Sequence, residues 1–228
     1  IQPFAKLSRV DLARTDLTGA NLAFANLSDA ILISANLAHA DLTGADLSDA
    51  ILSDANLAHA DLTGADLTGT FLTRANLKSA NLKSANFQYA VLGSVDLSGA
   101  DLAGTFLAGT FLAFAHLSDA NLTRANLTGA DLSDANLTRA NLTRADLSDA
   151  NLRGADLTGA DLTGANLTNT DGSRTFFLGA NLTGVDLSNA NLYDAKLRDA
   201  NLKRANLEGA HLTGADLTNA NLRAATMP

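Results

Sequence analysis

Cysteine and tryptophan are absent from the 228 residues, and aromatic residues make up only 5% of them. Without cysteine the chain can form neither a disulfide framework nor a thiolate metal site, and its redox compartment stays open. The only prolines, Pro3 and Pro228, lie near the two ends, so every residue between them keeps a backbone N–H. No apolar run approaches the length of about 18 residues that a membrane-spanning helix needs, so no membrane insertion is expected.

Positive charge is also scarce, because 16 Lys and Arg face 24 Asp and Glu, a net charge of −8. A general nucleic-acid binder needs a basic excess, so no direct nucleic-acid binding is expected, whereas a partner with a basic surface is compatible. The chain begins at Ile1 rather than Met, as a processed or truncated product does, and no basic-then-apolar leader is visible. The compartment stays open: the cytoplasm is favoured, and a secreted or extracellular location is compatible with the missing Met.

Leucine and alanine are abundant instead, and they recur every five residues. Between Asn121 and Ala165 nine units follow one another without an insertion. One such unit is Ala130-Asp131-Leu132-Ser133-Asp134. We name its positions the alanine slot, the outer slot, the leucine slot, and the first and second corner slots.

The slots are filled almost uniformly along the chain. Leucine occupies 41 of 44 leucine slots, and the exceptions are Phe87, Gly172 and Phe177. Alanine occupies 35 of 44 alanine slots, and Asn or Asp 33 of 43 outer slots. So much regularly spaced leucine argues against low-complexity disorder, and one slot filled the same way many times is typical of a repeat protein.

A period of five fits neither a helix nor a straight strand, because successive leucines would wander around the helix or alternate between the faces of the strand. The pattern resolves if the chain turns after each unit, with the alanine and leucine slots inside and the outer slot outside. Glycine supports this, since 15 of 17 glycines occupy the second corner slot, where a turn with positive φ is expected. Four sides then make a coil of 20 residues, and spacing alone leaves the hand of the coil open.

The repeated A(D/N)LXX unit resembles the pentapeptide-repeat family from about Ala5 to Ala225. The resemblance implies an all-β, right-handed quadrilateral β-helix: one rod over residues 1–228, with about 11 four-sided coils. It also implies two kinds of relative. Some mimic B-form DNA and protect type II topoisomerases such as gyrase, and many have no assigned activity. The mimics usually carry a C-terminal dimerisation helix, whereas here the repeats continue to Asn221.

A column of apolar residues in the outer slot is the main candidate interaction surface. Its members lie 20 residues apart and are expected to stack on one outer face: Ile31, Ile51, Phe71, Val91 and Phe111, joined by Ile33 and Phe114. A contiguous exposed apolar strip indicates a protein contact or a dimer seam. The alternative is divergence of the repeat sequence without a function, in which neighbouring apolar side chains shield one another from solvent.

Residues 170–178 break the pattern and are expected to form either a contact loop or an irregular coil. The candidate loop residues are Asp171, Gly172, Ser173 and Arg174, with Asp-Gly as the turn. Gly172 leaves a hole in the leucine slot, which Phe177 is expected to fill if the segment stays in the rod.

Other residues suggest weaker alternatives. His39 and His59 lie one coil apart, but duplication of a 20-residue block explains them more simply than a metal site does. The aspartates Asp41, Asp61, Asp101 and Asp161 share a column, as a DNA mimic would need, although cationic side chains lie on or beside the same side.

No catalytic constellation or phosphate-binding loop is present, so neither an enzyme nor a cofactor is expected. The favoured function is a non-catalytic scaffold for protein interaction or self-association. The alternatives are a DNA-mimicking gyrase protector and a subunit that stacks head to tail into filaments.

Overall fold

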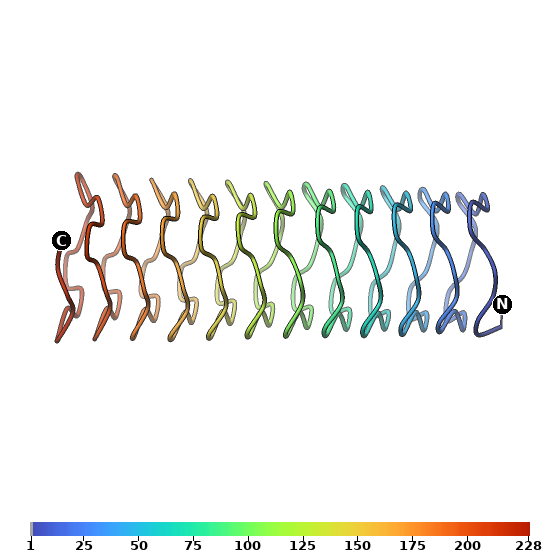
Figure 1. Ribbon diagram of the computed structural model, residues 1–228, viewed down its shortest axis with the longest axis horizontal. Helices are drawn as coiled ribbons and strands as arrows, with labels where there is room; N and C mark the ends of the chain where they lie inside the picture. The colour runs from blue at the N-terminus through green and yellow to red at the C-terminus, as the bar shows by residue number, and fades with distance from the viewer. Residues whose placement is uncertain (1) are drawn as a thin grey trace.

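The computed structural model describes residues 2–228, and the chain runs along a straight rod with its two termini at opposite ends (Figure 1). Within this range the chain forms no helix and no continuous strand. Each outer-slot residue instead pairs by an isolated parallel bridge with the residue 20 positions later, from Lys6 with Asn26 to Asn206 with Thr226. No helix in this part of the chain could span a bilayer.

Backbone hydrogen bonds join each unit to the coils on both sides. In the unit that begins at Asn21, the Leu22 N–H donates to Asp41 O at 2.7 Å and the Phe24 N–H to Thr43 O at 2.8 Å, both in the following coil. The next outer-slot N–H, that of Asn26, donates to Ala5 O in the preceding coil at 2.9 Å. The same pattern is repeated along the rod, so three lateral bonds per unit tie the coils together. A proline within the repeats would break this pattern.

Every second corner slot from Phe4 to Ala224 has positive φ, between 54° at Asp134 and 73° at Gly214. The expectation drawn from glycine is therefore confirmed, because all 15 glycines of this slot lie in the left-handed region. The alanine-slot N–H closes each corner, for example from Ala25 to Leu22 O at 3.0 Å. Glycine, Asn and Asp adopt this conformation at least cost, and here Arg, Ser, His and aromatic residues adopt it too.

Asn and Asp in the outer slot stabilise the corner that follows them. The Oδ1 atom of Asp131 accepts a hydrogen bond from the Ser133 N–H at 3.1 Å, which is an Asx-type turn. The same oxygen accepts from Nδ2 of Asn151, one coil later, at 2.9 Å. This slot lies outside the rod, as expected, but its carboxylates and amides also link one coil to the next, which the spacing along the chain did not indicate.

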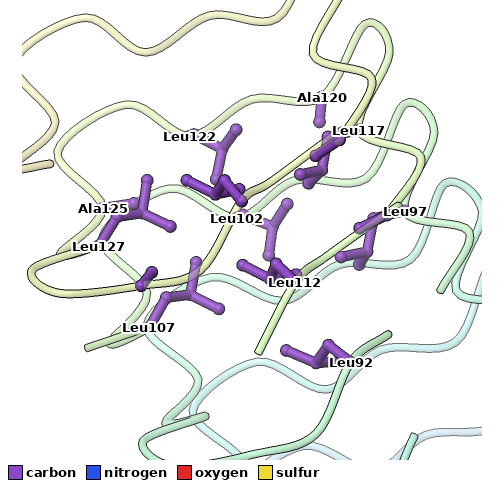
Figure 2. Close-up of a cluster of buried hydrophobic side chains, with 14 of the residues drawn as sticks. Leu92, Leu97, Leu102, Leu107, Leu112, Leu117, Ala120, Leu122, Ala125 and Leu127 are labelled. Carbon is purple, nitrogen blue, oxygen red and sulfur yellow. The ribbon is translucent and has the colours of Figure 1, made fainter. Parts of the chain in front are cut away.

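The leucine and alanine slots form one continuous core. Leu92, Leu102, Leu112 and Leu122 have no exposed surface, and Figure 2 shows leucines of successive coils gathered in the rod interior. Apart from the partly buried Thr15 in the first coil, the threonines in the alanine slot are equally buried. Their hydroxyls bond to backbone, as Thr105 Oγ1 does to Leu102 O at 2.8 Å. The inward assignment of these slots is confirmed. In the first and last coils the leucines are only partly buried.

Since one corner follows every unit and the coil contains 20 residues, the rod has four sides. We number them by their outer-slot columns. Side 1 runs from Asn21 to Asn221, side 2 from Lys6 to Thr226, side 3 from Asp11 to His211 and side 4 from Asp16 to Asp216. Corner 2–3 joins sides 2 and 3, and corner 3–4 joins sides 3 and 4.

Candidate functional site

The apolar column lies on side 3 without interruption. Parallel bridges join Ile31 to Ile51, Ile51 to Phe71, Phe71 to Val91 and Val91 to Phe111. Phe71 is 47% exposed and Phe111 is 55% exposed, whereas the two isoleucines and Val91 are half-buried by their neighbours. We call these five residues the apolar strip.

Charged residues bound the apolar strip at both ends. Asp11 pairs with Ile31 at one end of the strip, and Asp131 pairs with Phe111 at the other. Ile33 and Phe114 both follow side 3 on corner 3–4, and both are exposed. They lie beside opposite ends of the strip, Ile33 next to Ile31 and Phe114 next to Phe111, and so they do not touch each other.

Two exposed aromatic residues near Phe111 were missed by the sequence analysis. Phe106 lies on side 2 in the same coil as Phe111 and is 47% exposed. Tyr89 lies on corner 2–3 and is 70% exposed. The signal that could have revealed this region is the run from Leu102 to Ser118, which contains no charged residue. We call Phe106, Tyr89, Phe111 and Phe114 the aromatic arc.

Residues 170–178 continue the rod rather than leaving it as a loop. Asp171 bridges to Asn151 and Asn191, and its Oδ1 accepts from the Ser173 N–H at 3.0 Å, as in regular units. Arg174 has the positive φ of any second corner slot. The structure thus differs from the contact-loop expectation, because the outer-slot Asp still forms its turn and its lateral bonds although leucine is missing.

The gap left by Gly172 is closed by residues of this coil and the next. The Cδ2 atom of Leu192 lies 3.0 Å from where a Cβ on Gly172 would be. Phe177 is fully buried in the same coil and adds volume to the core. The Thr175 hydroxyl donates to Leu152 O of the preceding coil at 2.7 Å, instead of bonding to its own corner.

The repeated unit of this chain also occurs in known proteins. A family model described as pentapeptide repeats (8 copies) matches overlapping segments that together run from residue 4 to residue 227. The chain belongs to the pentapeptide-repeat family. The family and the β-solenoid fold inferred from the period are therefore confirmed.

Solved structures of other pentapeptide-repeat proteins resemble this one. HetL, described as involved in heterocyst differentiation regulation in the cyanobacterium Nostoc sp. strain PCC 7120, is 37% identical over 99% of this chain and 90% of its own, with a TM-score of 0.51. Rfr23 from the cyanobacterium Cyanothece 51142 is 41% identical over 41% of this chain and 60% of its own, with a TM-score of 0.35. QnrB1, a plasmid-mediated fluoroquinolone resistance protein, is 18% identical over 90% and 92%, with a TM-score of 0.40. No curated protein matches the chain.

The acidic column of this pentapeptide-repeat protein takes part in the hydrogen bonding of the rod itself. On side 1, Asp61 accepts from Thr63 and from Nδ2 of Asn81, and Asp101 accepts from Nδ2 of Asn121. Burial raises the pKa of Asp61, but the bonds from Thr63 and Asn81 and the charge of Lys83 outweigh it and leave the pKa below 3.8. Lys83 also pairs with Asp101 at 3.0 Å. Amides and a lysine thus interrupt the line of negative charge.

The two histidines do not converge on a shared metal position. The rings of His39 and His59 are stacked, with centroids 5.0 Å apart and planes inclined by 7°. Because ring nitrogens donate within the plane of the ring, parallel rings direct their lone pairs along parallel lines. Within residues 2–228, no group of three or more His, Cys, Asp or Glu could hold a metal ion.

A shallow surface hollow surrounds the former candidate loop. Arg153, Ser173, Arg174, Tyr193 and His211 line it, together with Asp171 and Asn191. Asp134 lines the adjoining hollow with both arginines. Carboxylates and guanidinium groups of similar number share this surface, so it does not present a concentrated charge of one sign.

Proposed function

We propose that this pentapeptide-repeat protein is a non-catalytic rod that binds another protein through the apolar strip. The observation that carries the proposal is the unbroken bridging of Ile31, Ile51, Phe71, Val91 and Phe111 on side 3. Exposed apolar residues scattered singly need no explanation, but a contiguous strip bounded by polar residues is typical of protein interaction sites. Aromatic enrichment and loss of charge are also what distinguish the centre of an interface.

The proposal includes two finer features of the rod. The coils are right-handed and number about eleven, which the 20-residue register and the family resemblance support. Chains that return to a parallel neighbour after a crossover strongly favour the right-handed connection. HetL, over nearly the full length of this chain, is described as involved in regulation, which supports a regulatory scaffold rather than an enzyme.

The DNA-mimicking alternative is weaker because the acidic column is interrupted by Asn81, Asn121 and Asn141 and by the Lys83–Asp101 ion pair. A gyrase supercoiling assay over a titration of the protein tests it, and no effect at micromolar excess removes it. The filament alternative predicts assemblies that grow with concentration, which sedimentation velocity detects.

Site-specific photo-crosslinking tests the proposed function. Phe71, Phe111 or Phe176 is replaced singly by p-benzoylphenylalanine in the organism that encodes the chain. Phe176 is the matched control, because it is an outer-slot phenylalanine of similar exposure (46%) on side 4. Adducts of one mass are expected from positions 71 and 111 and not from 176. If neither strip position gives an adduct beyond that of the control, the apolar strip is not an interaction surface.

The double variant Phe71→Asp/Phe111→Asp tests whether the apolar strip is needed for binding. Aspartate is a normal residue of the outer slot, so the rod should fold with little change in melting temperature. Two charges in the strip are expected to weaken the interaction at least about tenfold, since truncation of central aromatic residues typically costs that much. If the strip is instead a dimer seam, this variant should change the oligomeric state, and an unchanged oligomeric state would leave that alternative without support.

A further inference from the structure

The aromatic arc covers nearly half of the circumference of one coil. Phe106 lies on side 2, Phe111 on side 3 and Phe114 on corner 3–4, all within 102–118. Their exposed fractions are 47%, 55% and 59%. Three phenylalanines therefore face three adjacent directions around the rod, whereas the apolar strip faces only one.

Tyr89 closes the space between Phe106 and Phe111 from the preceding coil. Its ring carbons Cδ1 and Cε1 lie 3.4 Å from where a Cβ on Gly109 would be. Gly109 is the second corner slot between Phe106 and Phe111. Because Gly109 has no side chain, the tyrosine ring lies over this position of corner 2–3, between the side that carries Phe106 and the side that carries Phe111.

The surroundings of the aromatic arc are those of an interface centre with a polar rim. The 17 residues from Leu102 to Ser118 carry no charge in a protein of net charge −8. On side 2 the bridged neighbours of Phe106 are Asn86 and Asn126, and on side 3 Asp131 follows Phe111. An uncharged aromatic centre surrounded by polar groups is the arrangement found where a partner excludes water from the middle of a contact.

A second copy of this chain does not fit this surface. A flat seam across side 3 could cover Phe71 and Phe111, but Phe106 lies beyond corner 2–3 and would stay in solvent. The strip is about 25 Å by 10 Å, roughly 250 Å², whereas stable interfaces cover about 800 Å² on each partner.

Charge also disfavours a symmetric seam. With the two rods parallel, Asp131 would face its own copy. With the rods antiparallel and centred on Phe71, Asp131 would face Asp11, because the two aspartates lie at equal distances from Phe71 in the column. Like charges directly opposite one another are unfavourable in either arrangement.

We infer that the partner is a different protein whose uncharged, apolar groove is concave and clasps the rod at the aromatic arc. The inference deepens the proposed function and rests on it. A concave groove is required because a convex corner with aromatic residues on both sides of it can be covered at once only by a surface that wraps around it. The strip from Ile31 to Val91 then extends the contact along side 3.

Crosslinking at a side 2 position separates this inference from the proposed function. With Phe106→p-benzoylphenylalanine we expect the same heterologous adduct as from position 111, and none from the side 4 control at Phe176. A homodimer adduct from position 111, or an adduct from 71 and 111 but not from 106, would overturn the clasp while leaving the proposed function intact. No adduct from any of the three positions above the control would overturn both.

Deletion of residues 76–85 provides a second test that changes no residue of the strip or arc. Two whole units are lost, so the five-residue pattern continues from Ala75 to Asn86, but all later residues move by two sides. Ile31, Ile51 and Phe71 then stay on side 3 while Val91 and Phe111 move to side 1, and the four arc residues stay together. Once the crosslinked protein has been identified and purified, it should still bind this variant, with an affinity reduced because Ile31, Ile51 and Phe71 no longer extend the contact beside Phe111. Loss of detectable binding would show that the long strip, not the arc, is recognised.

The variant Phe106→Asn tests the contact on side 2 directly, with the same purified partner. Asparagine is the commonest kind of residue in the outer slot, and the bridged neighbours of Phe106 are both asparagines, so folding should be unaffected. Binding measured by calorimetry is expected to weaken at least about tenfold, and by less than twofold for Phe176→Asn. Equal affinities for the two variants would refute a contact on side 2.

Discussion

Leu132 has no exposed surface, and Thr128, four residues earlier, lies on a corner with part of its side chain in solvent. The effect of a substitution on the stability of this rod therefore depends on the slot in which it lies. The Leu132 side chain lies wholly in the rod interior. The Thr128 backbone N–H donates to Asn126 Oδ1 at 3.0 Å, and this bond does not depend on the Thr128 side chain. Burial of a carboxylate without a partner is among the most costly changes known in proteins.

Leu132→Asp should therefore destabilise the rod by about 4 kcal/mol or more, and Thr128→Asp by roughly 0.5 kcal/mol or less. Thermal and denaturant unfolding followed by circular dichroism measure both. Both variants introduce aspartate, and their positions lie in neighbouring units. The main difference between them is therefore whether the side chain points into the rod or toward solvent. Equal melting temperatures would contradict the inward and outward assignment of the slots.

At the scale of the repeating element, corner side chains of successive coils interact along each edge of the rod. Arg74 pairs with Asp54 at 2.7 Å, and Arg139 pairs with Asp119 in the same way at 2.6 Å. The hydrogen bond from each arginine lowers the pKa of its aspartate below the ordinary 3.8. These four side chains are well exposed, so each pair contributes little at neutral pH.

The sign of the pKa shifts predicts acid sensitivity. A carboxyl whose pKa is lower in the folded chain than in the unfolded chain stabilises the fold above a pH of 3.8, and that contribution is lost as the pH falls through the lower folded value. The melting temperature should therefore fall on acidification below about pH 4. In Asp54→Asn/Asp119→Asn it should be lower at pH 7 and should fall less between pH 5 and pH 2. A parallel decline in both proteins would show that the ion pairs do not contribute.

The leucine slot, the corner and the 20-residue register could all be predicted, because each is a local property repeated dozens of times. The hand could not, since a spacing is the same in a coil and its mirror image. The continuous strip from Ile31 to Phe111 was also predictable, because it follows a single column.

The aromatic arc was missed for a physical reason. Phe106 and Phe111 are neighbours around one coil, a relation that a search along columns does not reveal. Tyr89 covers Gly109 because side chains in the second corner slot lean toward the following coil, as Asp134 does over Gly154. Its direction depends on backbone conformation at the corner, which the sequence specifies only once the fold is known.

At the scale of the whole molecule, each coil bonds only to the coils on either side, so stability is expected to grow with the number of coils. Deletion of residues 141–160 removes one coil and joins Ala140 to Asp161 in register. The shortened rod should keep its circular dichroism spectrum and lose only a few degrees in melting temperature.

Deletion of residues 141–143 alone is the matched control. It puts every later leucine out of its slot and should abolish cooperative folding of the second half of the rod. If the two deletions were equally harmful, coils would not be the independent units that the hydrogen bonds indicate.

The direction of the lateral hydrogen bonds has an electrostatic consequence for the whole rod. In each unit two N–H groups point toward the following coil and one toward the preceding coil, as at Leu22, Phe24 and Asn26. Peptide dipoles within a unit therefore cancel only in part, and the remaining component along the rod axis adds from unit to unit, whereas an ordinary sheet has only a small net dipole. The positive pole lies toward the later coils, opposite in sense to the macrodipole of an α-helix. The two halves of the rod are thus electrically distinct to an approaching partner even where their side chains are the same.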